Sequence, residues 1–486
     1  MKRPISVILI STWVSASSAR RRPHTGTSKL QETTTSDHTR VIRVIFLVTV
    51  MSTVLIANAI WQTHPIVWSH ERQITNGSGE SRLVDITTDP SGNMVYLAWQ
   101  DNRDRRVEVY YKRSLDDGVT WGPDVRLSQL TPQTLEPEPR LATNGQTVFI
   151  LFSNRTSTGE HLFYVVSNDR GTNFSTPIEL TYDPGDQTNA ALAFVGSTIH
   201  VVWQEQLNNG EVHVIYVNSP NAGVTWQRTI DLTNATAIQD QYATITAAGS
   251  NVFVAWSRMY EGTEAVYCRV SLDSGETWRP EVQVSDYEGQ AFPQFPSIGS
   301  NGTYAHLVWG SVQGIQYSRS SNVGARWSTP LTLTNTTRQY VAPKITVTNS
   351  QIQVVTAGIM GLSSDVYYLS SSDAGESWSQ TVSLTAHRSD ALSLAPVISS
   401  NGDSTFVAWE DNRNGRLAIF FLSKPDFTVL RAFEWQLFVA FIIVLGTATI
   451  SFVAMEMRHS KAKVRRIRKR RAHQSHSQHR LANARR

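Results

Sequence analysis

Short apolar runs separated by polar turns fill the middle of the chain, and they return in the same order through seven repeats. The most regular run alternates in polarity and ends, in six of the seven repeats, in an aromatic residue. These runs are VYLAW at Trp99, VFILF at Phe152, IHVVW at Trp203, VFVAW at Trp256, AHLVW at Trp309, IQVVT at Thr356 and TFVAW at Trp409. A fainter run precedes each of them and further runs follow, which predicts four strands per repeat. Four short strands per repeat, with almost no helical periodicity, predict the blades of a β-propeller.

The regular run of each repeat is followed by another apolar run. In the first six repeats, an eight-residue turn motif comes directly after that second run. The copies occupy residues 114–121, 167–174, 219–226, 271–278, 320–327 and 371–378, and their closing aromatic residues are 53, 52, 52, 49 and 51 residues apart. Such a spacing indicates a repeat array. A Ser, an Asp or Asn two residues later and a Gly two further on favour a tight turn, because short polar side chains bond nearby N–H groups and Gly adopts positive φ. We name these segments the repeat turns.

The repeat turns resemble the Asp-box, or bacterial neuraminidase repeat, SxDxGxTW, of sialidase-like β-propellers. The positions that carry the resemblance are Ser114, Asp116, Gly118, Trp121, Asp169, Gly171, Gly223, Trp226, Ser271, Asp273, Gly275, Trp278, Gly324, Trp327, Asp373, Gly375 and Trp378. Asn221 and Asn322 replace the Asp, Phe174 replaces the Trp, and Ser377 replaces the Thr. In that family the boxes are structural and lie away from the active site, so the resemblance implies a fold, not a reaction.

The last repeat stops after its third strand, and the missing strand is expected at the other end of the array. Trp68 and the seven residues after it align without a gap to the segments that begin at Trp121, Trp278 and Trp378. We therefore expect residues 69–75 to pair with the strand that holds Phe420 and Phe421. This pairing would close the ring and protect its sheet edges.

Two apolar segments flank the repeats. Residues 44–61 contain no charge over 18 positions, and residues 437–455 are uncharged over 19 and precede a basic tail. Both predict membrane-spanning helices, with the basic ends inside and the repeats outside. A cleaved signal peptide around residues 5–14 is disfavoured by the arginines that follow it, and a start at Met51 stays open as an alternative.

The expected fold class is all-β: a seven-bladed β-propeller of four-stranded antiparallel blades, closed by an N-terminal strand and flanked by two transmembrane helices. The expected parts are a basic cytoplasmic leader (1–43), a signal-anchor helix (44–61), the propeller (67–424), a second spanning helix (435–457) and a basic cytoplasmic tail (458–486). The expected location is a cell membrane, with the propeller extracytoplasmic and both termini cytoplasmic.

The repeat turns and the links between blades lie on opposite faces of such a ring, and short linkers place the repeat turns toward the bilayer. The other face then carries two similar turns, QDNRDRR and EDNRNGR, from neighbouring blades. Asp101 with Arg103 and Asp411 with Arg413 are therefore candidates to bind a sugar or a carboxylate ligand. The favoured alternative is structural: the Asp bonds its own backbone and the Arg pairs locally.

The resemblance to sialidases implies three converging arginines, a Tyr–Glu nucleophile pair and an acidic Asp. The arginine motif expected in the first blade is absent, although the corresponding strand contains Arg82. The most similar sequence in the chain is EPRLA, which contains Arg140. Weak catalytic candidates are Arg338, Tyr340, Arg388 and Asp390. The leading hypothesis is a glycan- or protein-binding surface module, and the alternative is a sialidase or related exo-glycosidase.

Charge and metal-ligand patterns narrow the possible partners. Residues 62–433 hold 24 basic and 36 acidic residues, a net charge of −12, whereas the whole chain carries +4. The basic tail is expected to lie on anionic lipid, a glycan or surface protein is a possible ligand, and nucleic acid is disfavoured.

The single cysteine, Cys268, excludes an internal disulfide framework. No metal site and no cofactor are expected, because no His or Cys grouping has ligand spacing.

Overall fold

The structure, a computed structural model, describes residues 68–90, 92–134, 136–207, 209–233, 239–286, 295–335, 338–385 and 391–425, together with 451, 454–455, 457–459 and 461–472. By chain contacts, residues 66–437 form one compact unit, and residues 1–65 with 438–486 form another. All strands among the residues that the structure describes lie in the first of these units.

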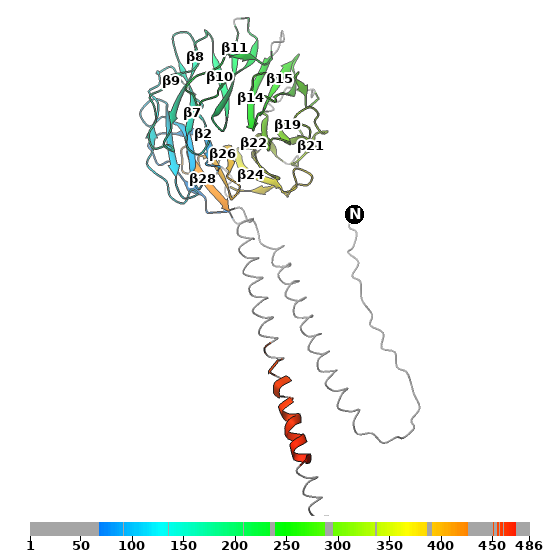
Figure 1. Ribbon diagram of the computed structural model, residues 1–486. Coiled ribbons are helices and arrows are strands. Elements are labelled where there is room, and N and C mark those ends of the chain that lie inside the picture. The colour runs from blue at the N-terminus through cyan, green and yellow to red at the C-terminus, as the bar shows by residue number, and fades with distance from the viewer. Residues whose placement is uncertain are drawn as a thin grey trace, which may run out of the picture. The chain divides into compact units, whose positions relative to one another are not determined.

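Seven groups of four strands follow one another along the chain. The first six groups are β2 (Ser81–Thr88), β3 (Val95–Asp101), β4 (Glu108–Ser114), β5 (Val125–Arg126); β6 (Arg140–Thr143), β7 (Val148–Arg155), β8 (Glu160–Ser167), β9 (Ile178–Glu179); β10 (Gln187–Val195), β11 (Thr198–Gln206), β12 (Val212–Ser219), β13 (Ile230–Asp231); β14 (Gln239–Ala248), β15 (Asn251–Tyr260), β16 (Thr263–Ser271), β17 (Val282–Gln283); β18 (Ser297–Ser300), β19 (Ala305–Ser311), β20 (Gly314–Ser320), β21 (Leu331–Thr332); and β22 (Gln339–Thr348), β23 (Gln351–Met360), β24 (Ser363–Ser371), β25 (Val382–Ser383). The last group is β26 (Ser393–Ser400), β27 (Ser404–Asp411), β28 (Ala418–Pro425) and β1 (Arg72–Gln73). We call these groups blades one to seven, and Figure 1 shows them arranged around a common centre.

The N-terminal strand closes the ring as the sequence predicted. β1 pairs antiparallel with β28, with Arg72 opposite Phe421 and Gln73 opposite Phe420. Trp68, just before β1, packs edge-on against Tyr368 of blade six at 4.9 Å between ring centroids. Trp68 thus takes the place that the closing Trp of a repeat turn takes in other blades.

The expectation of seven separate sheets is corrected to six sheets among the described residues. Five sheets have four strands, and the sixth has eight because blades three and four are joined. The link is one parallel pair, Val212 opposite Gln239, supported by a hydrogen bond from Gln239 Nε2 to the Gly210 carbonyl (2.8 Å). Strand alternation cannot reveal a pairing between blades, because it reports only which side chains face the core.

The core lies between blades and not within them. Each of its hydrophobic clusters combines side chains of two neighbours; one joins Trp99 of blade one to Phe406 and Phe421 of blade seven. The aromatic residues that end the regular apolar runs are buried, and Trp99, Trp256, Trp309 and Trp409 are at most 1% exposed. The repeated aromatic residue is therefore the part of each blade that anchors the next.

The six repeat turns share one hydrogen-bonded geometry. In residues 271–278, Ser271 Oγ donates to Asp273 (2.7 Å), Gly275 N–H donates to Ser271 Oγ (2.8 Å), and Thr277 N–H donates to Asp273 (2.9 Å). The copy with Asn221 keeps the equivalent bonds, at 3.0, 2.8 and 2.8 Å. The substitutions that weaken the sequence motif thus leave the turn intact, because Asn offers the same acceptor oxygen as Asp.

The expected membrane helices require a correction. No helix among the described residues is long and apolar enough to cross a membrane. The fold class is corrected to an all-β domain without the two flanking transmembrane helices, and the location in a cell membrane that depended on them is corrected with it. Residues 44–61 lie outside the described part, as do residues 435–457 apart from Ser451, Ala454, Met455 and Met457. Apolar runs of 18 and 19 residues are near the lower limit of length for a membrane span, and hydropathy alone reports only that such a run is long enough to cross.

Candidate functional site

In blade one, the candidate ligand-binding residues Asp101 and Arg103 are already paired with other groups of the protein. Asp101 is buried and accepts hydrogen bonds from Ser81 Oγ (2.7 Å), Trp99 Nε1 (3.2 Å) and the Arg103 backbone N–H (2.9 Å). The Arg103 guanidinium lies 2.6 Å from Asp101 and 2.5 Å from Asp124. Burial alone would raise the pKa of Asp101, but the hydrogen bonds from Arg103 and Ser81 lower it below its ordinary 3.8.

Blade seven repeats this arrangement. Asp411 accepts bonds from Ser393 Oγ (2.7 Å) and Trp409 Nε1 (3.0 Å), and Arg413 Nη2 lies 2.6 Å from Asp411. The second partner of Arg413 is Glu71, next to β1. Every charge in these two pairs has a local partner, an arrangement that favours the structural alternative. Ligand binding at Asp101, Arg103, Asp411 and Arg413 stays a prediction.

The weak catalytic candidates are brought together only in part. Arg338 Nη1 lies 4.0 Å from Asp365 Oδ2, and its guanidinium is 5.4 Å from the ring centroid of Tyr367. Tyr340 is buried, packs against the same ring, and has its pKa raised by burial. A raised pKa opposes the activation that a nucleophile requires. Arg388 and Asp390 lie outside the described residues, so the catalytic set stays a prediction.

We call the first strand of each blade along the chain its inner strand: β2, β6, β10, β14, β18, β22 and β26. Near the start of each inner strand, or two residues before it, one residue lies in the left-handed region of the backbone. These residues are Leu83, Glu138, Asn189, Tyr242, Phe295, Ala342 and Ala395, with φ between 41° and 57°. In five of the blades the residue lies in a β-bulge. Non-glycine residues seldom adopt this conformation, and bulges often re-aim side chains next to functional sites.

Two residues beyond each of these positions, the side chains line a central channel. The channel positions are Asp85, Arg140, Ala191, Thr244, Ser297, Lys344 and Val397, and the cavity they share measures about 390 Å³. Residues from all seven inner strands contribute to its wall. Three of the seven channel positions are charged, and the small side chains between them leave room for a ligand.

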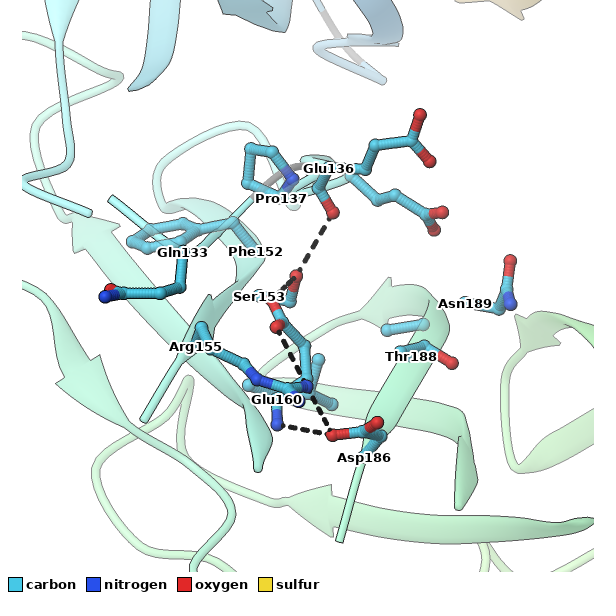
Figure 2. Close-up of a pocket in the computed structure, with 13 residues that line it drawn as sticks. Gln133, Glu136, Pro137, Phe152, Ser153, Arg155, Glu160, Asp186, Thr188 and Asn189 are labelled. Carbon is cyan, nitrogen blue, oxygen red and sulfur yellow. Dashed lines mark hydrogen bonds and ion pairs between the residues drawn. The ribbon is translucent and has the colours of Figure 1, made fainter. Parts of the chain in front are cut away.

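A larger cleft of about 720 Å³ lies between blades two and three. A row of polar side chains crosses it (Figure 2): Ser153 Oγ donates to Glu160 (2.9 Å), and Arg155 Nη1 lies 3.7 Å from Glu160 and 2.6 Å from Asp186. Buried Phe152 and Leu162 line its apolar side. Burial raises the pKa of Glu160.

The cleft adjoins the channel. Glu138, Asn189 and Ala190 line both cavities. Four carboxylates line the cleft, on Glu136, Glu138, Glu160 and Asp186, against one guanidinium. An anionic group would therefore be repelled from the cleft, whereas uncharged hydroxyl groups would find acceptors there.

Neither the channel residues nor the cleft were predicted from the sequence. One signal was present: PRL at Pro139, PSI at Pro296, PKI at Pro343 and PVI at Pro396 are equivalent in four blades. Aligning them places Arg140 and Lys344 in the same register. Among the described residues, no group of three or more His, Cys, Asp or Glu side chains could hold a metal ion.

Comparison with solved structures shows similar folds at low sequence identity. Polysaccharide lyase Uly1 superposes with a TM-score of 0.52 and 8% identity, over 74% of this chain and 100% of that one. An ulvan lyase of family PL25 gives 0.50 and 14%, over 72% and 95%. A Trypanosoma rangeli sialidase in complex with the inhibitor DANA gives 0.42 and 12%, over 74% and 60%. No protein-family model and no curated protein matches the sequence. The two polysaccharide lyases therefore share the β-propeller fold of this chain.

Proposed function

We propose that the protein binds a saccharide in the cleft between blades two and three. The observation that carries the proposal is the row formed by Ser153, Arg155, Glu160 and Asp186 beside an apolar wall. A ligand site typically combines apolar lining with a few fixed polar groups. Here Arg155 is held by two carboxylates, so the acceptor oxygens are oriented before any sugar hydroxyl arrives.

A further point supports a carbohydrate ligand. The PL25 ulvan lyase with a similar fold was solved bound to -[GlcA(1-4)Rha3S]-. Since carboxylates outnumber cations in the cleft, uncharged sugar units are the ones it would accept.

Calorimetric titration of the full chain with cellohexaose, mannohexaose and maltohexaose tests the proposal. We expect at least one of them to bind, and Glu160→Gln to weaken that binding by about fivefold or more, since a charged hydrogen-bond acceptor is replaced by a neutral one (about 1 kcal/mol). The matched control is Glu376→Gln, an exposed carboxylate in a repeat turn of blade six, which should bind like the unaltered chain.

Failure of all three saccharides to bind, or equal affinities for Glu160→Gln and Glu376→Gln, would contradict the proposal. A fluorogenic sialoside in the same preparation tests the alternative, exo-glycosidase activity. Turnover that disappears in Arg338→Ala would favour that alternative.

A further inference from the structure

At six places in the chain an asparagine is followed directly by a glycine. Such a pair can react with itself, because glycine has no side chain to shield its backbone nitrogen and its backbone rotates freely. The glycine nitrogen attacks the side-chain amide carbon of the asparagine, ammonia leaves, and water opens the resulting ring to aspartate or isoaspartate. The reaction requires that the glycine N–H and the asparagine amide are both free to move.

Three of the pairs form the turns between the first two strands of blades two, five and seven, and both reacting groups are held there. The glycine N–H donates to a hydroxyl oxygen of the residue two positions earlier, at 3.0 Å in Asn144–Gly145, 2.9 Å in Asn301–Gly302 and 3.2 Å in Asn401–Gly402. The asparagine side chains donate to carbonyl oxygens of the next blade around the ring, at 2.7, 2.9 and 3.0 Å in the same order. These bonds must break before the pairs can react.

Two further pairs are held by contacts outside these turns. In Asn209–Gly210 and Asn414–Gly415, the glycine N–H donates to a backbone carbonyl three residues earlier, at 2.9 and 2.8 Å. The asparagine side chains donate to Glu211 (2.6 Å) and Gln73 (2.7 Å), respectively. Five of the six pairs are therefore restrained at both reacting groups.

The sixth pair, Asn76 with Gly77, has neither restraint. Asn76 is exposed, and no residue that the structure describes bonds its side chain or the Gly77 N–H. The chain is fixed on both sides of the pair, since Thr75 Oγ1 accepts a bond from β28 (3.0 Å) and the Ser78 carbonyl accepts one from Arg416. The reactive groups thus lie unbonded in a short segment that directly follows the ring-closing strand.

We propose that Asn76 is a site of spontaneous deamidation in the folded protein. The Gly77 nitrogen gives its proton to a solvent base and forms a bond to Asn76 Cγ. The bond from Cγ to the side-chain nitrogen breaks, and this nitrogen takes a proton from water and leaves as ammonia. Water then adds to a carbonyl carbon of the succinimide ring and opens it to aspartate or isoaspartate. The other five pairs react at least about tenfold more slowly, because their hydrogen bonds must break first.

The new carboxylate would arise beside an arginine that already holds two carboxylates. A Cβ atom on Gly77 would lie 2.9 Å from Arg103 Nε, and Arg103 is paired with Asp101 and Asp124. An isoaspartate also lengthens the backbone by a methylene group. The modification therefore changes both the charge and the chain geometry next to the strand that closes the ring.

The test is an incubation of the full chain in mildly alkaline buffer, with samples digested at intervals and the six Asn-Gly peptides followed by mass spectrometry. Conversion should appear first at Asn76, at least about tenfold faster than at Asn301. Isoaspartate is identified by methyl transfer from an isoaspartyl methyltransferase. In urea, where the hydrogen bonds of the fold are absent, the six pairs should react at similar rates.

Two variants separate the effect of the fold from that of the sequence. Ser300→Ala removes the acceptor of the Gly302 N–H and should accelerate conversion of Asn301 severalfold without changing that of Asn76. Gly77→Ala should slow conversion of Asn76 severalfold, because the methyl group hinders the attacking nitrogen. Equal rates at Asn76 and Asn301 in the folded chain, or an undiminished lead of Asn76 in urea, would overturn the proposal. None of these measurements involves the saccharide cleft.

Discussion

Glycine at the fifth position of a repeat turn is fixed by two independent constraints. Gly275 has φ of +90°, and a Cβ atom there would lie 1.8 Å from the hydroxyl of Tyr216 in the preceding blade. The same clash, again at 1.8 Å, occurs between Gly375 and Tyr317. The sequence motif shows only the first constraint, since the turn is local. The second appears only when neighbouring blades are packed.

Gly275→Ala should therefore cost more than the backbone conformation alone explains. We expect the free energy of unfolding to fall by about 2 kcal/mol or more, measured by urea denaturation, because left-handed strain of about 1–2 kcal/mol is joined by the clash with Tyr216. Gly249→Ala is the matched control: its φ is +60° and no atom lies within 4 Å of the added methyl group. An equal loss of unfolding free energy in the two variants would show that the contact with Tyr216 does not contribute to stability.

Contacts between residues that are close in the sequence could be predicted, whereas contacts between residues that are far apart in the sequence could not. Ser271, Asp273 and Thr277 bond within one turn, so their spacing is sufficient to predict the geometry. Lys344 differs, because its surroundings come from Asp85 and Arg140 in blades one and two, far away in the sequence. A lysine within an alternating strand looks like a surface residue until the ring brings seven inner strands together.

At the scale of elements, the ring depends on a short strand that is remote in sequence from its partner. Directly after β1, Ile74 donates its N–H to the Ile419 carbonyl at 2.8 Å, and its side chain is buried. Thr75 Oγ1 accepts a bond from Ile419 N–H at 3.0 Å. The alignment of Trp68 with other blades predicted this strand, because every blade has the same four-strand order. The pairing between blades three and four had no such repeat signal.

Ile74→Pro should open this junction. Proline removes the N–H that bonds Ile419, whereas Ile74→Ala removes the side chain and keeps the donor. We expect the proline variant to lose about 1 kcal/mol more unfolding free energy than the alanine variant, as measured by urea denaturation. Two variants of equal stability would mean that the β1–β28 pairing does not hold the ring closed.

At the scale of the whole molecule, the blades differ in the side chain at one equivalent buried position. The second residue of each regular apolar run is Tyr96, Phe149, His200, Phe253, His306, Gln353 or Phe406. The sequence pattern alone did not predict that these positions are in the core, yet all seven are buried. It did not predict that two histidines would be neutral there, since that depends on partners across the blade. His200 and His306 each place Nδ1 within 2.8 Å of a tyrosine hydroxyl, that of Tyr216 or Tyr317.

These two histidines should make the protein less stable in mild acid. Burial lowers the pKa of both from 6.5 to about 4, so between these values the unfolded chain binds protons that the folded chain excludes. The free energy of unfolding should then fall as the pH drops from 6.5 toward 4, by up to about 1.4 kcal/mol per pH unit for each histidine. Buried Asp240 acts oppositely, because burial raises its pKa to about 6.

The effect of the two histidines is therefore measured by comparing the pH dependence of the unfolding free energy between the unaltered chain and a variant that lacks them. Blade six already carries glutamine, Gln353, at the position that His200 and His306 occupy in blades three and five, so glutamine is a replacement that this fold accommodates. The double variant His200→Gln with His306→Gln should flatten the urea-denaturation profile between pH 7 and pH 5, because it removes both groups whose protonation favours the unfolded chain. A double variant that keeps the original slope would show that neither imidazole is held neutral by the fold.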